Sequence, residues 1–524
     1  MATLSIGGLP TAESLKDHPL QPWIIAGTVM LATFMEVLDT SVANVALPHM
    51  AGNLGATSDE ATWVLTAYLV ANAIILPMSG WFSMIFGRKR FYMTCVFLFT
   101  LSSALCGLAP SLFMLILFRV MQGVGGGALQ PVSQAILRET FPREKQGMAM
   151  AVFGIGVVFA PVIGPTLGGW ITDNWSWRWI FYINVPVGVL SLLLTQMLVH
   201  DPPWLKRRTL KEGHIDFMGL GLLTLGLGAL EIMLDEGQRN DWFGSHMIVS
   251  AAVIAGVCLM GVVFWELRHE HPVVDFRLLK DRDFAISSFS MYALGFVLYG
   301  STVLLPLFMQ ELLGYSATDS GLALSPGGLV VMACMPAVGM LVSRVQPRWL
   351  VAFGLAMSAV GLWQMSGFTL GVDFRHILGA RCVQSVGMAF LFVPINTMAF
   401  YYISREKLNY ATGIMNLARN IGGSCGIAFS VTMLARRAQY HQSVLVGHVT
   451  ALDLGFRQAL QGTAQMLHQY GWSMADATER AQAMMYGLVQ QQSAALAFVD
   501  TFWVLALIFV GLIPFMFLMR GVRR

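Results

Sequence analysis

The sequence predicts an all-helical membrane protein with fourteen transmembrane helices, arranged as two six-helix halves and an extra helix pair. Composition is the first reason: 56% of the 524 residues are hydrophobic and 12% are charged, whereas soluble domains carry about 25% charged residues. Long apolar runs are the second reason, because about 20 apolar residues cross a bilayer as a helix. An internal repeat, described below, is the third.

The apolar runs follow one another along the whole chain. They are too long and too uniformly apolar for barrel strands, which alternate over short segments. We therefore expect one helix in each of these segments: 22–48, 61–85, 91–109, 111–137, 147–172, 177–199, 215–234, 245–266, 284–310, 320–343, 349–370, 375–402, 408–435 and 495–519.

The positive charges support this count. With the N-terminus in the cytoplasm, twenty-two of the 32 Lys and Arg residues, including every lysine, fall in cytoplasmic segments, and seven fall outside. The other three, Arg119, Arg381 and Arg419, lie within predicted helices. Cytoplasmic loops carry an excess of Lys and Arg, so we expect both termini to be cytoplasmic.

A repeated pattern divides the chain into halves. Arg-x-x-Gln-x-x-Gly begins at Arg119 in the fourth run and again at Arg381 in the twelfth, 262 residues later. Pro131 is echoed by Pro394 at nearly the same offset. Internal repeats are typical of secondary transporters, whose substrate site lies between the repeats.

The repeat sets the predicted domains. They are a cytoplasmic tail at 1–21, a six-helix half at 22–200, a linker with two extra helices at 201–282, a second half at 283–519 and a cytoplasmic tail at 520–524. The second half contains one long polar insert, 438–494, predicted to lie outside. The insert is rich in Ala, Gln and Met, so it predicts one or two amphipathic helices. These would serve either as a solvated cap or as a docking surface.

Two carboxylates lie inside the first apolar run. Glu36, Asp39 and Thr40 share a helix face by their i, i+3, i+4 spacing, and Asn44 continues this polar stripe. An acid at such depth usually faces a wet cavity or a partner and marks a proton or ion path. The alternative is that the stripe only bonds to neighbouring helices.

Arg119 is the expected partner of Asp39. Counted at 1.5 Å per residue, the two reach a similar depth in the membrane from opposite faces. A buried guanidinium does not deprotonate, so it needs an acid or carbonyls nearby. We interpret Asp39, Glu36 and Arg119 as proton-coupling residues, since an approaching cation would favour loss of the acid's proton. The alternative for Arg119 is a static packing role.

Other polar or aromatic side chains at middle depth are candidates for a substrate cavity, although most of the 33 Met and 33 Phe are expected to face lipid or core. The candidate substrate-binding residues are Asn44, Gln122, Tyr292, Tyr299, Gln310, Gln384, Asn396, Asn416, Arg419 and Asn420.

The fifth run is rich in glycine and proline. Small residues let helices approach closely and prolines bend them, so this run indicates packing and hinging. The residues concerned are Gly154, Gly156, Pro161, Gly164, Pro165, Gly168 and Gly169.

Several function classes are disfavoured. The net charge of +3 indicates no nucleic-acid partner, and no Walker A motif is present, so ATP is not the expected energy source. The six cysteines lie in apolar runs, which indicates neither disulfides nor a metal site. We expect no enzyme, no catalytic residues and no cofactor, with the proton motive force as the energy source.

The chain resembles the major facilitator superfamily, in particular its 14-helix drug:proton antiporters and most closely the EmrB-type exporters. The resemblance covers about 22–519. The supporting runs are LDTSVANVALP at 38–48, LFRVMQGVGGG at 117–127, APVIGPTLGG at 160–169, WRWIFYINVPVG at 177–188 and NLARNIGGSCG at 416–426. The resemblance implies that 160–169 is the antiporter motif, Asp39 the coupling acid and Arg119 the fourth-helix arginine.

One residue departs from the family pattern. In the loop motif after the second helix, Met84 stands where the superfamily usually has an acid, although Gly80, Gly87 and Arg88 remain. The resemblance also implies a bacterial inner membrane, a periplasmic membrane-fusion adaptor of the EmrA type and an outer-membrane channel.

These observations predict a proton-coupled antiporter that exports amphipathic drugs or other hydrophobic toxic compounds by alternating access, within a tripartite efflux system. The alternative is a proton-coupled uptake symporter of the same fold, against which the antiporter motif counts. A transporter-like sensor without flux would not need both Asp39 and Arg119.

Overall fold

The computed structural model describes residues 20–142, 145–201, 216–270, 272–401, 403–404, 407–447, 449–450 and 453–518. Within these ranges every regular element is helical, which confirms the predicted all-α class. The predictions for residues 1–19, for the linker stretch 202–215 and for the tail 520–524 lie outside the described residues.

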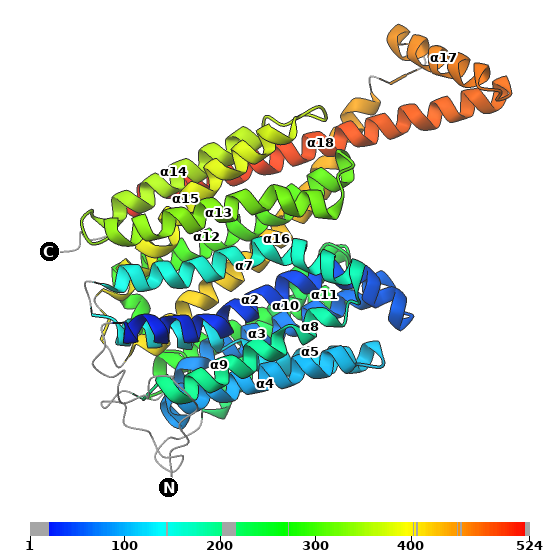
Figure 1. Ribbon diagram of the computed structural model, residues 1–524. Coiled ribbons are helices and arrows are strands. Elements are labelled where there is room, and N and C mark those ends of the chain that lie inside the picture. Colours follow the sequence, from blue (N-terminus) through cyan, green and yellow to red (C-terminus); the bar gives the residue numbers. More distant parts are fainter. Residues whose placement is uncertain are drawn as a thin grey trace.

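The first group of helices comes from the N-terminal part of the chain (Figure 1). The predicted segment 111–137 contains two consecutive helices, α5 and α6, and the predicted segment 177–199 contains α8 and α9. The group consists of α2 (Gln21–Leu54), α3 (Ser58–Phe86), α4 (Arg88–Leu108), α5 (Leu112–Gly126), α6 (Leu129–Thr140), α7 (Gln146–Asn174), α8 (Trp179–Tyr182) and α9 (Asn184–Leu198).

A helix pair follows and packs against both groups. It comprises α10 (Phe217–Glu236) and α11 (His246–Arg268), with the short η2 (Trp242–Gly244) between them. Asp235 of α10 accepts a hydrogen bond from Thr66 of α3. Trp242 of η2 donates to Thr432 in the second group, 3.1 Å away. The extra pair therefore contacts elements of both groups.

The second group comes from the C-terminal part of the chain and lies beside the first (Figure 1). A short helix, η3 (Phe276–Lys280), precedes it. The group consists of α12 (Arg282–Leu307), η4 (Phe308–Leu312), α13 (Ala317–Leu341), α14 (Pro347–Met365), α15 (Phe374–Phe400), α16 (Leu408–Val446), α17 (Leu454–Gln469) and α18 (Met474–Met516).

Among the described residues, eleven helices are long and apolar enough to cross a membrane, or twelve if bent α7 counts as one span. The two remaining predicted segments, 349–370 and 408–435, hold α14 and α16. Both pack within the second group, α14 on α15 and α18, and α16 on α12 and α18. Helices thus occupy all fourteen predicted segments, while a total of fourteen crossings stays a prediction.

Helix α7 lies at the contact between the groups, packing on α2 and on α13. Its two parts, Gln146–Pro161 and Ile163–Asn174, meet at 42°. Proline cannot donate a backbone hydrogen bond, so Pro165 leaves the carbonyl of Pro161 without its helical partner. Ser41 of α2 replaces that bond, its Oγ donating to the Pro161 oxygen at 3.1 Å. The bend is therefore stabilised by a side chain of the neighbouring helix.

The described chain begins and ends at the same end of the bundle, where α2 starts and α18 finishes (Figure 1). At the opposite end, α17 and the first part of α18 project as a helical hairpin beyond all other helices (Figure 1). Ala464, Ala477 and Ala481 are buried between the hairpin's two helices. The polar insert thus forms helices, as its composition predicts.

Candidate functional site

Asp39 is the centre of a buried hydrogen-bond network. Its side chain is buried on α2, and Arg119 Nη1 of α5 donates to its Oδ2 at 2.5 Å. Its Oδ1 accepts from Gln122 Nε2 at 3.0 Å and from Asn184 Nδ2 of α9 at 2.7 Å. Three donors from two other helices therefore hold this carboxylate.

Arg119 uses its planar fork on three acceptors, one of which is Gln122 Oε1, at 2.8 Å from Nη1. Besides Asp39, its Nε donates to the backbone oxygen of Val64 on α3 at 3.1 Å. The guanidinium carbon lies 4.3 Å from the centre of the Tyr68 ring, in a cation–π contact. One guanidinium thus ties α5 to both α2 and α3, and the structure brings together the acid and the arginine that the sequence pairs.

Glu36 lies one helical turn from Asp39 and has a different environment. Its Oε1 accepts from Tyr68 Oη at 3.2 Å and from Asn72 Nδ2 at 3.1 Å. Its Oε2 accepts from Gln130 Nε2 of α6 at 2.7 Å. All three donors are neutral, and no ion pair to Glu36 is found within the described part of the chain.

Gln130 also joins the two groups of helices. While its amide nitrogen binds Glu36, its Oε1 accepts a hydrogen bond from Arg419 Nη2 of α16. A single neutral amide therefore connects a carboxylate of the first group with a guanidinium of the second. Both side chains are buried, and Gln130 connects them through its two hydrogen bonds.

Two further residues of α6 contact the second group: Gln134, one turn after Gln130, and Arg138, one turn after Gln134. Gln134 Oε1 accepts from Asn416 Nδ2 of α16 at 2.8 Å. Arg138 Nη2 donates to the backbone oxygen of Asn396 on α15 at 2.9 Å. Spacing of four residues places side chains on one helix face, so α6 presents a continuous polar row to the second group.

The repeated motif forms similar bonds in the second group. Arg381 Nη1 donates to Gln384 Oε1 at 2.7 Å, and Gln384 Nε2 donates to Ser301 Oγ of α12 at 2.8 Å. Ser301 follows Asp39 by 262 residues, the same offset that separates Arg381 from Arg119. The second group therefore has a hydroxyl where the first has a carboxylate.

The remaining cavity candidates are scattered. Asn44 is exposed and donates to the Thr40 oxygen of its own helix at 3.1 Å, and Gln310 is exposed on η4. Tyr292 and Asn420 are partly buried, while Tyr299 lines a small cavity between the groups. Asn44 and Gln310 therefore lie outside the buried networks described above.

The small residues of α7 allow close helix contacts. A Cβ on Gly164 would overlap Ser41 of α2, and one on Gly168 would lie 2.9 Å from Val42 Cγ1. A Cβ on Gly154 would lie 3.0 Å from a ring carbon of Phe392 on α15. Gly169 is looser, since a Cβ there would be 3.8 Å from Val45.

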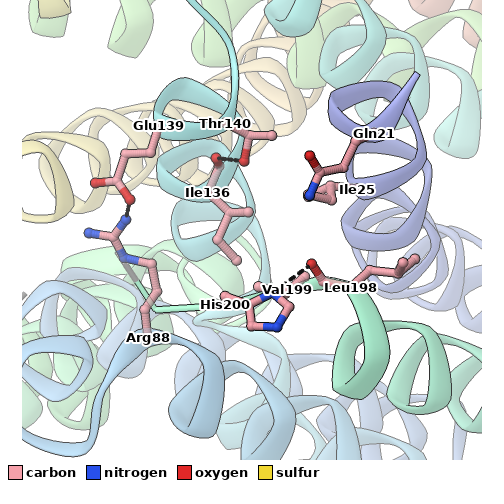
Figure 2. A pocket seen from close by; sticks show the side chains of 9 residues that line it. All are labelled: Gln21, Ile25, Arg88, Ile136, Glu139, Thr140, Leu198, Val199 and His200. Carbon is pink, nitrogen blue, oxygen red and sulfur yellow. Dashed lines mark hydrogen bonds and ion pairs between the residues drawn. The ribbon is translucent and has the colours of Figure 1, made fainter. Parts of the chain in front are cut away.

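A second charge pair, formed by a buried arginine and a partly buried glutamate, lies at the end of the bundle where α2 begins. Figure 2 shows Arg88, at the start of α4, paired with Glu139 near the end of α6. The two line a cavity of about 170 Å³ together with Gln21 and His200. The loop motif that contains Arg88 has Met84 where an acid is usual. Glu139, from α6, provides the acid that pairs with Arg88.

Sequence reasoning did not find several members of these networks, and four of them surround Asp39 and Glu36. Asn184, Tyr68, Asn72 and Gln130 are neutral, and neutral polar side chains in apolar runs give no strong signal on their own. A signal was available for Gln130, which forms an i, i+4, i+8 row with Gln134 and Arg138.

Residues 29–427 match the Major Facilitator Superfamily. The chain is 37% identical over 485 residues to the Multidrug export protein EmrB of Haemophilus influenzae, with 92% of each chain covered. It is 35% identical over 491 residues to the Fatty acid resistance protein FarB of Neisseria gonorrhoeae, with 94% of each covered.

Two solved structures share the fold. The proton:xylose symporter XylE matches with a TM-score of 0.61 at 14% identity, covering 96% of each chain. The human organic anion transporter MFSD10 matches with a TM-score of 0.57 at 12% identity, covering 93% of this chain and 99% of the other. These likenesses show the fold alone.

The many apolar helices define a multi-pass membrane protein, and the family match with the named export relatives indicates a transporter. The chain belongs to the major facilitator superfamily.

Proposed function

We propose that the chain is a proton-coupled antiporter that exports amphipathic drugs or other hydrophobic toxic compounds across a bacterial inner membrane by alternating access. The observation that carries the proposal is the buried Asp39–Arg119 pair, with its 2.5 Å contact. An ionisable carboxylate this deep in a membrane protein is costly unless it is used or paired.

The network supplies a route from protonation to movement. Arg119 remains charged at all relevant pH values, so a proton on Asp39 removes the negative charge that the arginine faces. The donors to Asp39 lie on α5 and α9, and each loses an ionic acceptor when the acid is neutral. Protonation therefore weakens the attachment of α2 to these two helices, and a cationic substrate favours the reverse step.

The direction of transport rests on similarity. Relatives that cover more than nine-tenths of the chain carry names that refer to multidrug export and to fatty acid resistance. We propose the same direction for this chain, out of the cytoplasm. Both termini are then cytoplasmic, and the projecting hairpin of α17 and α18 is periplasmic.

The hairpin suits a docking role. Its apolar side chains Leu454, Met466, Tyr470, Met484 and Leu488 are exposed, and apolar surface of this extent usually has a partner. We propose that a periplasmic membrane-fusion adaptor of the EmrA type covers them and connects the transporter to an outer-membrane channel. No cofactor is needed, since the proton gradient supplies the energy.

Reconstituted vesicles with an acidic lumen test the transport step. An antiporter in these vesicles moves protons out and carries a cationic dye such as ethidium into the lumen. We expect accumulation that disappears when an ionophore collapses the gradient, and none in protein-free vesicles. Dye that leaves the lumen together with protons would instead identify a symporter, and gradient-independent movement would exclude proton coupling.

A further inference from the structure

A small cavity lies between the two groups of helices. It has a volume of about 30 Å³ and is lined by residues of α7 from the first group and of α12, α13 and α15 from the second. The lining is largely apolar, with Val157, Leu298, Val331 and Met388 among its residues. One charged side chain lines it, that of Arg381.

Arg381 is buried but only partly bonded. Its Nη1 donates to Gln384, while its Nε is buried with no hydrogen-bond partner among the described residues. Within the same residues no carboxylate lies within 4.0 Å of this guanidinium. A buried guanidinium keeps its charge, so an uncompensated one is expensive unless an anion joins it.

The contrast with Arg119 shows what Arg381 lacks. Arg119 has a carboxylate, Asp39, and a backbone oxygen on its Nε. At the repeat position of Asp39 the second group has Ser301, which accepts from Gln384 and carries no charge. The second copy of the motif therefore keeps the arginine and its glutamine, but not the acid.

Gly327 of α13 leaves space beside the free nitrogen. A Cβ at this position would lie 3.3 Å from Arg381 Nε and 2.6 Å from Ser385 Oγ. Any other residue would therefore press on the edge of the guanidinium that has no partner. The glycine, the apolar walls and the unpaired donor together form a cavity suited to a small anionic group.

We propose that Arg381 binds the carboxylate head group of an amphipathic substrate, so that exported compounds include long-chain carboxylic acids. A planar carboxylate matches the guanidinium fork and supplies the missing charge. A cavity of about 30 Å³ holds a group of roughly water size, which limits the closed site to the head group. This proposal rests on the proposed transport function, whose substrate class it specifies.

Ligands that differ only in the head group test the proposal. Binding of dodecanoate and of dodecanamide to the purified protein in nanodiscs is measured by tryptophan fluorescence, with empty nanodiscs as blanks. We expect the wild-type protein to bind the carboxylate at least about tenfold more tightly, because a charge-assisted hydrogen bond contributes that much. In Arg381→Gln this ratio is expected to fall to about one.

The control is Arg375→Gln, which removes an exposed arginine from the first turn of the same helix. We expect it to keep the wild-type ratio. Ser301→Asp is a second variant, independent of any folding defect in Arg381→Gln. It places an acid where the first group has Asp39, so that the protein's own carboxylate occupies Arg381, and it should also lower the ratio to about one.

Two results would overturn the proposal: equal binding of carboxylate and amide by the wild-type protein, or a wild-type ratio in either folded variant. The test does not depend on transport. Proton-driven movement of ethidium without head-group preference would leave the proposed function standing and reject the carboxylate site. Head-group preference without proton-driven movement would support the carboxylate site and reject the proposed function.

Discussion

Asp39 and Ser301 accept equivalent hydrogen bonds in the two halves of the molecule, each from the glutamine of an Arg-x-x-Gln motif, at 3.0 and 2.8 Å. The first is a carboxylate paired with Arg119, and the second is a hydroxyl that leaves Arg381 without an ionic partner among the described residues. The repeated arrangement thus has two electrostatic outcomes. In the proposals above, the first group exchanges a proton at Asp39 and the second binds an anion at Arg381.

The first prediction is that Asp39→Asn abolishes proton coupling while the protein still folds. An asparagine can still accept from Gln122 and Asn184, so the network keeps most of its hydrogen bonds, but it cannot exchange a proton. We expect no drug-induced proton release from the purified variant in detergent, followed with a pH-sensitive dye. Proton release equal to that of the wild type would assign coupling to another group, for which Glu36→Gln is the next variant.

The second prediction is that Arg119→Lys does not restore function. An ammonium cannot keep the geometry in which Nη1 binds Asp39 and Nε binds the Val64 oxygen. We expect ethidium transport in vesicles to fall at least about tenfold. Wild-type rates would show that a point charge is enough at this position and that the paired geometry is not required.

The third prediction concerns the amide between Glu36 and Arg419. Gln130→Leu removes both of its hydrogen bonds and leaves two buried charged groups with fewer partners. Such a loss costs about 1–3 kcal/mol, so the thermal midpoint of the purified protein should fall by several degrees. The control is Gln310→Leu, which changes an exposed glutamine and should leave the midpoint within error. An unchanged midpoint in Gln130→Leu would mean that the bridge is not maintained in solution.

The fourth prediction compares two glycines of α7. Gly164→Ala places a methyl group against Ser41, whereas in Gly169→Ala the new methyl lies 3.8 Å from Val45, an ordinary contact. Overpacking costs about 1–3 kcal/mol and would also disturb the Ser41 bond to the Pro161 oxygen. We expect impaired transport and a lower thermal midpoint in the first variant only. Equal behaviour of the two would show that α2 and α7 are not closely packed here.

The fifth prediction tests the hairpin. Replacing residues 447–481 by a short Gly/Ser linker removes its tip and keeps the hydrogen bond between Gln442 and Tyr486, which are 3.2 Å apart. We expect transport in vesicles to remain largely intact, because the helices of the bundle pack against one another without the tip.

In cells the same variant should lose adaptor binding in pull-down experiments and confer less drug resistance. If adaptor binding persists while vesicle transport fails, the hairpin acts as a lid on the transporter itself. The docking role would then be wrong.

The charged core of the site could be predicted from the sequence because a charge within an apolar run is rare and costly. Asp39 and Arg119 were paired from their depth along two antiparallel helices, and the structure places them 2.5 Å apart. Asn184 completes the network from α9 but is one of many neutral amides in the chain. Its position beside Asp39 depends on how α9 packs, which no local pattern encodes.

Asn44 and Gln310 show the opposite limit. Helical spacing puts Asn44 on the stripe of Asp39 and Thr40, yet its side chain is exposed near the end of α2. A stripe on a helix is buried only where a neighbouring helix covers it, and coverage changes along a helix of 34 residues. The ion pair of Arg88 with Glu139 was likewise hidden, because both residues lie outside the predicted apolar runs, where depth along a helix cannot pair them.

Helix α18 runs without interruption from the far end of the bundle into the hairpin, over 43 residues. At 1.5 Å per residue it is a rod of about 65 Å, anchored along α14 and α16. A tilt of this rod about its end in the bundle would therefore produce its largest displacement at the hairpin tip. If the protein works by the proposed alternating access, α18 is a lever that transmits the movement of the membrane domain to any protein attached to the hairpin.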